Sequence, residues 1–276
     1  MQIKYGCTYW GSDYLTPSEF VSKVIDAGYN GVEVFLQPPD KISAEFIVAL
    51  DEIRKQKPDF FLIALQLTIP VKESVKEYIA KMENNFLALA ELNPLFINSH
   101  TGKDYYSFED NCRVIEAAQN ISLKTGVRVM HETHRGRFSF HAATLLPYLN
   151  KFPEMNLVGD FSHFCTVSES MLEDQQDILN AIIPHIGHIH ARVGYEEGPQ
   201  VNNPAAPEWK EHVQTYMNWW QQIVQYRESK GDESFTITTE FGPFPYMPTE
   251  PFTKKPLSSQ WNNNLIMLQE LKKKFG

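Results

Sequence analysis

The sequence predicts a single α/β domain of the closed (β/α)8 or TIM-barrel class that spans residues 1–276. Short apolar runs alternate with longer amphipathic stretches along the whole chain, which is typical of repeated βα units. Eight such units in 276 residues match a closed parallel barrel. The first βα turn, GCTYWG (residues 6–11), also lacks the Gly-rich phosphate-binding pattern of an open doubly wound sheet.

Four βα units are predicted in the first half of the chain. Thr16 is a suitable N-cap for the first helix, and Pro17 fits its first helical position. Gly126 is placed to end the fourth helix, as glycine often does. The predicted strands cover residues 3–9, 31–35, 60–67 and 95–99, and the predicted helices cover residues 17–28, 43–57, 74–92 and 108–124.

The second half of the chain keeps the same alternation, and no change of composition marks a linker. Its predicted strands cover residues 127–132, 156–160, 186–191 and 235–240, and its predicted helices cover residues 142–151, 170–183, 207–229 and 258–274. The two longest loops, residues 193–207 and 241–257, are rich in Gly, Pro and Asn and follow strand ends. In a barrel of this class such loops form the active site.

Charge and cysteine content exclude several classes of partner. A net charge of -9 leaves no basic face for a nucleic-acid backbone. The cysteines Cys7, Cys112 and Cys165 are odd in number and widely spaced, which favours a reducing compartment. The N-terminus lacks a signal-peptide core, and no segment reaches the ~18 uninterrupted apolar residues of a membrane span. We therefore expect a cytoplasmic protein with no nucleic-acid or membrane partner.

Metal-compatible side chains end the last four predicted strands. They are Glu132 in VMHETH, Asp160 in VGDFSHF, His190 in HIHAR and Glu240 in TTEFGP. Strand alternation gives all four the same inward direction, and parallel strands end at one rim of a barrel. A single strand-end carboxylate is more often a helix cap or a salt bridge, but several carboxylates clustered without a cation would repel one another. The set therefore predicts a divalent-metal site.

Other histidines near these positions have different predicted roles. The HETHRG stretch (residues 131–136) is one residue short of the helical H-E-x-x-H zinc motif, so it is interpreted as a strand end. Alternation then turns His131 towards the helices, in a packing role. His188 shares the inward direction of His190 one layer deeper, so we expect it to support the ligands by hydrogen bonding.

The order Glu, Asp-x-x-His, His-x-His and Glu on strands five to eight resembles the xylose isomerase-like TIM-barrel superfamily of sugar phosphate isomerases and epimerases. The resemblance implies that Glu132, Asp160, His190 and Glu240 coordinate one divalent ion, Mn, Zn, Mg or Co. It also implies that His163 contacts substrate, and that Glu132 and Glu240 transfer protons through an enediolate. The implied partner is a small sugar, polyol or sugar phosphate, and the resemblance leaves a homo-oligomer open.

The sequence departs from the ketose 3-epimerase pattern at Phe138, where those enzymes have a second Glu, and in the run from Ala191 to Tyr195. A metal-dependent dehydratase of the inosose type and a catalytically silent sugar-binding barrel therefore remain alternatives. The AP-endonuclease branch is disfavoured because Gln66 stands where a His ligand is needed and because the chain is acidic.

Further strand-end residues are candidates for substrate contacts. Arg135 and Arg192 suit a phosphate or carboxylate, or else neutralise the acidic site. Glu33 and Gln66 suit a polyol, and Trp10 suits the apolar wall on which sugars stack, together with Tyr9, Phe35 and Tyr105. Core packing is the alternative for each aromatic ring. The remaining candidates are His100 and His134.

Overall fold

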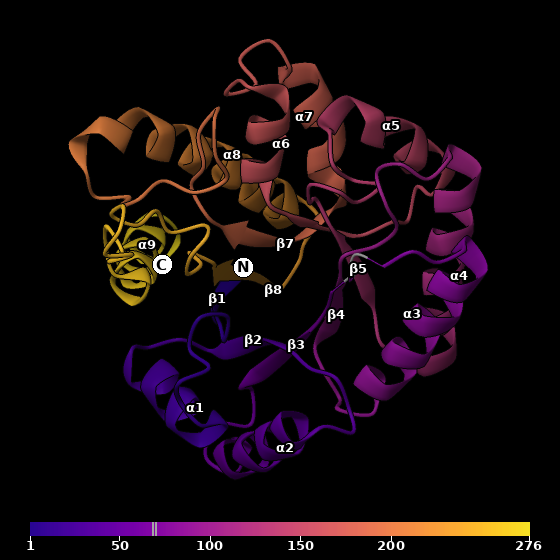
Figure 1. Cartoon of the computed structure of the whole chain (residues 1–276), viewed down its shortest axis with the longest axis horizontal. Helices are drawn as coiled ribbons and strands as arrows, with labels where there is room; N and C mark the ends of the chain where they lie inside the picture. The colour runs from indigo at the N-terminus through magenta and orange to yellow at the C-terminus, as the bar shows by residue number, and fades with distance from the viewer. Residues whose placement is uncertain (68, 70) are drawn as a thin grey trace.

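The computed structural model describes residues 1–67, 69 and 71–276, and its centre is a closed barrel of eight parallel strands (Figure 1). Each strand pairs with the next one in chain order, and β1 pairs with β8. The predicted fold class is therefore confirmed. The strands are β1 (Gln2–Thr8), β2 (Gly31–Phe35), β3 (Phe61–Gln66), β4 (Phe96–Ser99), β5 (Val129–Glu132), β6 (Leu157–Gly159), β7 (Ile186–Ala191) and β8 (Ser234–Thr239).

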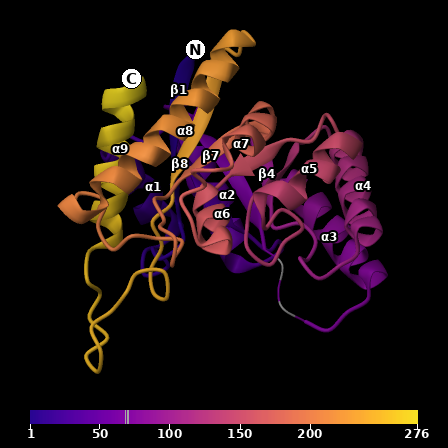
Figure 2. The ribbon, with the colours of Figure 1, turned by 90° about the horizontal axis from the view of Figure 1, so that it is seen from above.

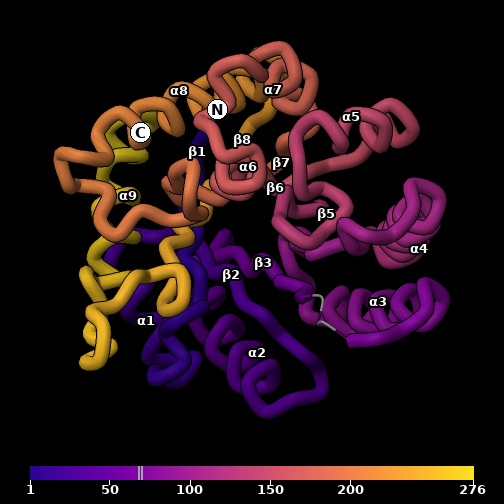
Figure 3. Tube along the Cα trace, turned by 45° about the horizontal axis from the view of Figure 1, so that its top comes forward, coloured from indigo at the N-terminus to yellow at the C-terminus, as the bar shows by residue number. Residues whose placement is uncertain are grey.

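The described residues also form nine α-helices and two short 3-10 helices. The α-helices are α1 (Pro17–Asp26), α2 (Lys41–Arg54), α3 (Val75–Ala90), α4 (Phe108–Thr125), α5 (Ala142–Lys151), α6 (Phe161–Ser168), α7 (Gln176–Ile182), α8 (Lys210–Ser229) and α9 (Gln260–Phe275). The 3-10 helices are η1 (Ile183–His185) and η2 (Pro207–Trp209). Helices α1 to α5 and α7 to α9 surround the barrel in chain order, and α6 lies inside this ring (Figure 3).

The region after β6 differs from the prediction of one helix over residues 170–183. Helix α6 begins at once after the strand, because the Asp160 side chain accepts a hydrogen bond from the Ser162 backbone N–H. Left-handed backbone at Glu169 (φ 47°) and Leu172 (φ 59°) then interrupts the helical path. The second helix, α7, consequently starts only at Gln176.

Local signals explain most of the other boundaries. The Thr16 hydroxyl and the Glu19 carboxylate form a capping box that starts α1, which confirms the predicted N-cap. Gly126 ends α4 in the left-handed conformation at φ 73°, also as predicted. Helix α2 begins two residues before its predicted start because Asp40 caps the Ser43 backbone N–H.

The core has two layers that together position the strand ends. One lies between the strands and the helices, and the other fills the barrel interior. The interior layer contains Phe61, Ile63, Phe96, Met130 and Val158. Polar side chains occupy the barrel beyond this apolar layer, at the carboxyl ends of β5 to β8.

Two long connections follow β7 and β8, as the sequence predicts. The segment between β8 and α9 extends away from the helices (Figure 2), and an isolated bridge between Thr249 and Pro256 joins its two arms. Among the described residues, every helix is too short or too polar to span a lipid bilayer.

Candidate metal centre

Four side chains from consecutive strands converge at the carboxyl end of the barrel. Glu132 ends β5, Asp160 follows β6, His190 lies in β7 and Glu240 follows β8. Each contributes one ligand-type atom, these atoms lie within 4.8 Å of one another, and all four residues are buried. The closed barrel therefore brings together the four residues that the sequence predicts as metal ligands.

His190 is held by a carboxylate on the far side of its ring. Its Nε2 lies 3.0 Å from both carboxylate oxygens of Glu33, so Nε2–H donates to that buried residue. The opposite nitrogen, Nδ1, lies 2.8 Å from Oε2 of Glu240 and 3.7 Å from Oε1 of Glu132. A carboxylate behind an imidazole is the arrangement that orients histidine ligands in metal sites.

The contact between His190 and Glu240 is close, and its geometry departs from that of an ordinary hydrogen bond. Nδ1 of His190 and Oε2 of Glu240 are both buried, and neither has a hydrogen-bond partner among the described residues. Buried polar atoms of this kind are costly unless something else binds them. Two buried ligand-type atoms this close together fit two ligands of one cation.

The electrostatics of the cluster also suit a cation. Burial alone would lower the pKa of His190, but the carboxylates of Glu240, Glu33 and Glu132 raise it well above its ordinary value. Burial opposes ionisation of Glu132, yet the imidazoles of His100 and His190 hold its pKa well below the usual range. The cluster thus attracts positive charge.

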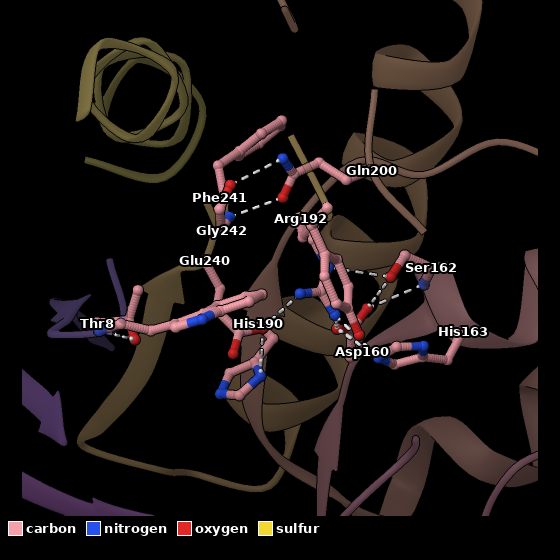
Figure 4. A network of polar contacts seen from close by, with 12 residues as sticks. Thr8, Asp160, Ser162, His163, His190, Arg192, Gln200, Glu240, Phe241 and Gly242 are labelled. Carbon is pink, nitrogen blue, oxygen red and sulfur yellow. Dashed lines mark hydrogen bonds and ion pairs between the residues drawn. The ribbon is translucent and has the colours of Figure 1, made fainter. Parts of the chain in front are cut away.

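Asp160 is held on both oxygens. Oδ1 accepts from the Ser162 backbone N–H at 3.0 Å and from the Ser162 hydroxyl at 2.5 Å, and Oδ2 contacts Nη2 of Arg192 (Figure 4). Burial raises the pKa of Asp160 to about 6, although Arg192 partly offsets this effect. The ligand is therefore fixed in position before any cation binds.

Arg192 lies inside the cluster as a buried counter-ion. Besides Asp160, its guanidinium contacts Glu240 (Nη1 to Oε2, 3.4 Å), and its Nη2 lies 2.9 Å from Nε2 of His163. The Tyr246 ring covers it, with 4.8 Å between the guanidinium carbon and the ring centroid. Arg192 thus contacts two of the four predicted ligands, which agrees with the neutralising role left open by the sequence.

The donor set fits a divalent ion. Three carboxylates and one imidazole Nδ1 form a mixed oxygen and nitrogen site, and two of its atoms lack a hydrogen-bond partner among the described residues. Oxygen donors dominate, which favours Mg²⁺ or Mn²⁺ over a thiolate-preferring metal.

Three histidines stack beside this cluster. The rings of His100 and His134 have centroids 4.2 Å apart, and those of His134 and His163 are 3.9 Å apart. Burial and the neighbouring cationic groups hold the pKa of both His134 and His163 well below the ordinary value. The rings of His134 and His163 therefore line this side of the site in their neutral form.

A second group of ligand-type atoms comprises His100, Glu132 and His134. Arg137 faces Nδ1 of His100 with its Nη2 at 3.4 Å, and a guanidinium can only donate. Nδ1 must therefore be the acceptor, and Nε2–H of His100 donates to Glu132 at 3.2 Å. This tautomer leaves His100 without a lone pair for a metal.

The remaining predicted residues lie around the cluster or away from it. His188 lies deeper in the barrel, where Thr236 and Thr238 contact its two ring nitrogens at 2.7 and 3.0 Å. Gln66 is buried, with its amide engaged by the Ser99 hydroxyl and the Leu67 carbonyl. Glu33 lies two residues before the end of β2 and contacts His190 rather than the rim.

Only Trp10 among the four predicted wall aromatics approaches the site, where it contacts the Tyr246 ring edge to face at 4.9 Å. Tyr105 is 72% exposed, and Phe35 is 37% exposed. Tyr9 packs between Phe20 and Phe46 in the outer core. His131 packs on Phe138 and contacts the Thr101 hydroxyl, in agreement with its predicted packing role.

Sequence reasoning missed three residues that shape the site. Asn98 donates to both Glu33 and Glu132 at 2.8 Å, and Ser162 binds Asp160. Tyr246 lies in the loop after β8 and contacts Arg192, Arg135 and His163. The predicted functional loop over residues 241–257 was the available signal for Tyr246.

Comparison with known proteins shows the fold. No family model matches the chain, and no curated protein matches its sequence. It resembles the solved structure of 3-keto-D-glucoside 4-epimerase from E. coli, with a TM-score of 0.62 and 12% identity over 99% of this chain and 100% of that one. It also resembles a probable 3-DHS dehydratase from Bacillus anthracis, with a TM-score of 0.61 and 12% identity over 98% of each chain. A third similar structure is a xylose isomerase-like TIM-barrel protein from Mycobacterium smegmatis in complex with magnesium, with a TM-score of 0.59 and 9% identity over 100% of this chain and 98% of that one. The chain therefore has the xylose isomerase-like TIM-barrel fold.

Proposed function

We propose that this protein is a divalent-metal-dependent isomerase or epimerase that acts on a small sugar, polyol or sugar derivative by proton transfer through an enediolate. One observation carries the proposal: Glu132, Asp160, His190 and Glu240 converge with their ligand atoms within 4.8 Å. The similarity in fold to a sugar epimerase and to a magnesium-bound barrel supports it.

The proposed chemistry uses two carboxylates and one cation. A bound divalent ion would polarise a sugar carbonyl and its neighbouring hydroxyl, and so would acidify the adjacent C–H. Glu132 is suited to accept that proton because it is a carboxylate that ends β5 within the cluster. Glu240, which approaches the same centre from β8, can return a proton to the other face or to the next carbon.

Neighbouring side chains orient the proposed base. Oε2 of Glu132 accepts from Asn98 Nδ2 at 2.8 Å and from His100 Nε2 at 3.2 Å. These two donors fix the carboxylate plane and leave Oε1 directed at His190. Orientation by two hydrogen bonds limits the motion that a proton-transfer step would otherwise have to correct.

A dehydratase is the second candidate, because the fold is as similar to the probable 3-DHS dehydratase as it is to the epimerase. Both reactions begin with the same proton abstraction, and they differ in whether a hydroxyl then leaves. We also propose the cytoplasm as the location, since the described cysteines are free thiols.

Metal analysis and isotope exchange test the proposal together. The purified protein should bind one divalent ion, and Glu132→Gln should weaken that binding. A matched control is Glu196→Gln, which changes a Glu–His pair outside the barrel, with His212 at 3.2 Å. Incorporation of deuterium from D₂O into a ketose supports proton abstraction, and loss of water from the product identifies the dehydratase. Equal metal content in wild type and Glu132→Gln contradicts the proposal.

A further inference from the structure

We infer that the site takes substrates carrying an anionic group, a carboxylate or a phosphate, and that Arg135 binds this group beside the metal centre. This inference rests on the proposed function and narrows its substrate class. Arg135 follows β5 by three residues and is half-buried.

Arg135 is a cation with neutral partners. Its Nε donates to Nδ1 of His163 at 3.1 Å, and its Nη2 donates to the Tyr246 hydroxyl at 3.3 Å. Among the described residues, no carboxylate lies within 4.0 Å of its guanidinium. A partly buried guanidinium is ordinarily paired with a carboxylate, because desolvation of an unpaired charge is costly.

The two arginines at the site differ in this respect. Arg192 is fully buried and is paired with Asp160 and Glu240. Arg135 lies nearer the solvent and keeps Nη1 without a hydrogen-bond partner in the part of the chain that the structure describes. Arg192 is thus paired with the acidic cluster, whereas the charge of Arg135 is not paired with a carboxylate.

His163 cannot provide the missing negative charge. Both of its ring nitrogens face guanidinium donors, Arg135 on one side and Arg192 on the other. A neutral imidazole accepts a hydrogen bond at only one nitrogen and carries a hydrogen on the other. At that second nitrogen the imidazole N–H therefore faces an arginine N–H, and the two repel each other. An anion near Arg135 would relieve this repulsion by drawing its guanidinium towards itself.

Geometry also suits an anion with paired oxygens. The guanidinium fork binds carboxylate and phosphate oxygens through two parallel N–H donors. Tyr246 covers the Arg135 guanidinium, with 5.7 Å between the guanidinium carbon and the ring centroid, and thereby limits its motion. A substrate placed with its carbonyl at the acidic cluster would extend its anionic end towards this fork.

Anion binding to the metal-free protein tests the inference. Chelator-treated protein is titrated calorimetrically with inorganic phosphate and, separately, with acetate, which distinguishes a phosphate from a carboxylate. We expect Arg135→Gln to weaken binding of the preferred anion by about 10- to 100-fold, the range for lost hydrogen bonds to a charged group. Arg113→Gln, which removes an equal charge from exposed α4, should change nothing.

Two outcomes overturn the inference: neither anion binds the wild type, or Arg135→Gln binds as tightly as the wild type does. The titration is then repeated with Mn²⁺ present. If phosphate binds only when Mn²⁺ is present, and binds Arg135→Gln as tightly as wild type, then phosphate is a ligand of the metal. This result also overturns the inference. The titration of chelator-treated protein needs no metal. Its result therefore stands even if the protein proves not to be a metal-dependent isomerase or epimerase.

The exchange assay gives a second readout with matched substrates. Deuterium incorporation into fructose 6-phosphate and fructose compares an anionic and a neutral sugar, and a keto acid such as 5-ketogluconate tests the carboxylate. We expect Arg135→Gln to raise KM for the anionic substrate at least tenfold and to change KM for the neutral one little. An equal effect on both substrates would indicate a structural role and would contradict the inference.

Discussion

Replacing Glu33 with glutamine should weaken metal binding by about 10- to 100-fold, the usual cost of altering a group that orients a metal ligand. Glu33 is only 1% exposed, and both of its oxygens lie 3.0 Å from Nε2 of His190. Glutamine keeps the size of the side chain and one acceptor but removes the charge. The expected change therefore reports on orientation and basicity of His190 rather than on packing.

The energy of the contact between Glu33 and His190 predicts a similar loss of metal affinity. A hydrogen bond to a charged group contributes about 1.5–3 kcal/mol, and 1.4 kcal/mol corresponds to a factor of ten in affinity. Loss of the charged component of the contact between Glu33 and His190 thus also predicts about a 10- to 100-fold change. Asn98, which donates to Glu33 at 2.8 Å, can still donate to the glutamine oxygen and limits disorder in the variant.

Calorimetric titration with Mn²⁺ measures this change, with Glu196→Gln as the control. The variant must first show a wild-type circular dichroism spectrum and cooperative unfolding, so that a folding defect is recognised. If Glu33→Gln binds Mn²⁺ as tightly as wild type, Nε2 of His190 is not the nitrogen that must be held. The assignment of Nδ1 as the ligand atom would then be wrong.

Three further predictions concern stability and packing. Arg192→Met removes the counter-ion of two buried carboxylates and should lower the free energy of unfolding by about 3–5 kcal/mol in a chelating buffer. Mn²⁺ should then raise Tm more in this variant than in wild type. An equal Mn²⁺ response in both proteins would argue that Arg192 and the metal do not share these carboxylates. Burial raises the pKa of Cys7 from 9.0 to about 12, so its contribution to stability is complete below pH 9 and is lost as pH rises towards 12, by about 1.4 kcal/mol per pH unit. Burial also raises the pKa of Cys165 to about 12, so denaturant unfolding of Cys7→Ala should show a shallower loss of stability than wild type, and an unchanged slope refutes the assignment. Gly242→Ala places a Cβ against the Trp10 indole and should shift the tryptophan emission, whereas an unchanged spectrum would show that the ring is not held there.

The strands and the convergence of the four strand-end residues were predictable because both follow from short-range patterns. Apolar runs mark buried parallel strands, and alternation gives each inward position. Closure of the barrel then brings Glu132 and Glu240 together, although 108 positions separate them in the chain. Predicting the convergence needed only the fold class and the parity of each residue.

Other features depend on contacts that no local pattern encodes. Glu33 and His190 are 157 positions apart, and their pairing depends on the depth of each residue in the barrel. The strand over residues 31–35 was predicted correctly, but Glu33 was assigned to substrate, whereas it lies within β2 and contacts His190. The conformation of the loop after β8, which brings Tyr246 over Arg192, likewise results from tertiary packing.

Helix α6 was missed for a different reason. Its sequence, FSHFCTVS, is short and mostly buried, so it shows no alternation of apolar and polar faces. The cap at Asp160 was visible as a residue type, but the same side chain was assigned to the metal site. The geometry permits both roles for one carboxylate, since Oδ1 caps the helix while Oδ2 contacts Arg192 and lies 3.6 Å from Nε2 of His163.

The most direct test of the metal centre is anomalous X-ray diffraction from crystals grown with Mn²⁺, measured on both sides of the manganese edge. We expect one strong peak, bounded by Glu132, Asp160, Glu240 and Nδ1 of His190. A peak at Glu33 and His188, or no peak in the barrel at saturating Mn²⁺, would contradict it.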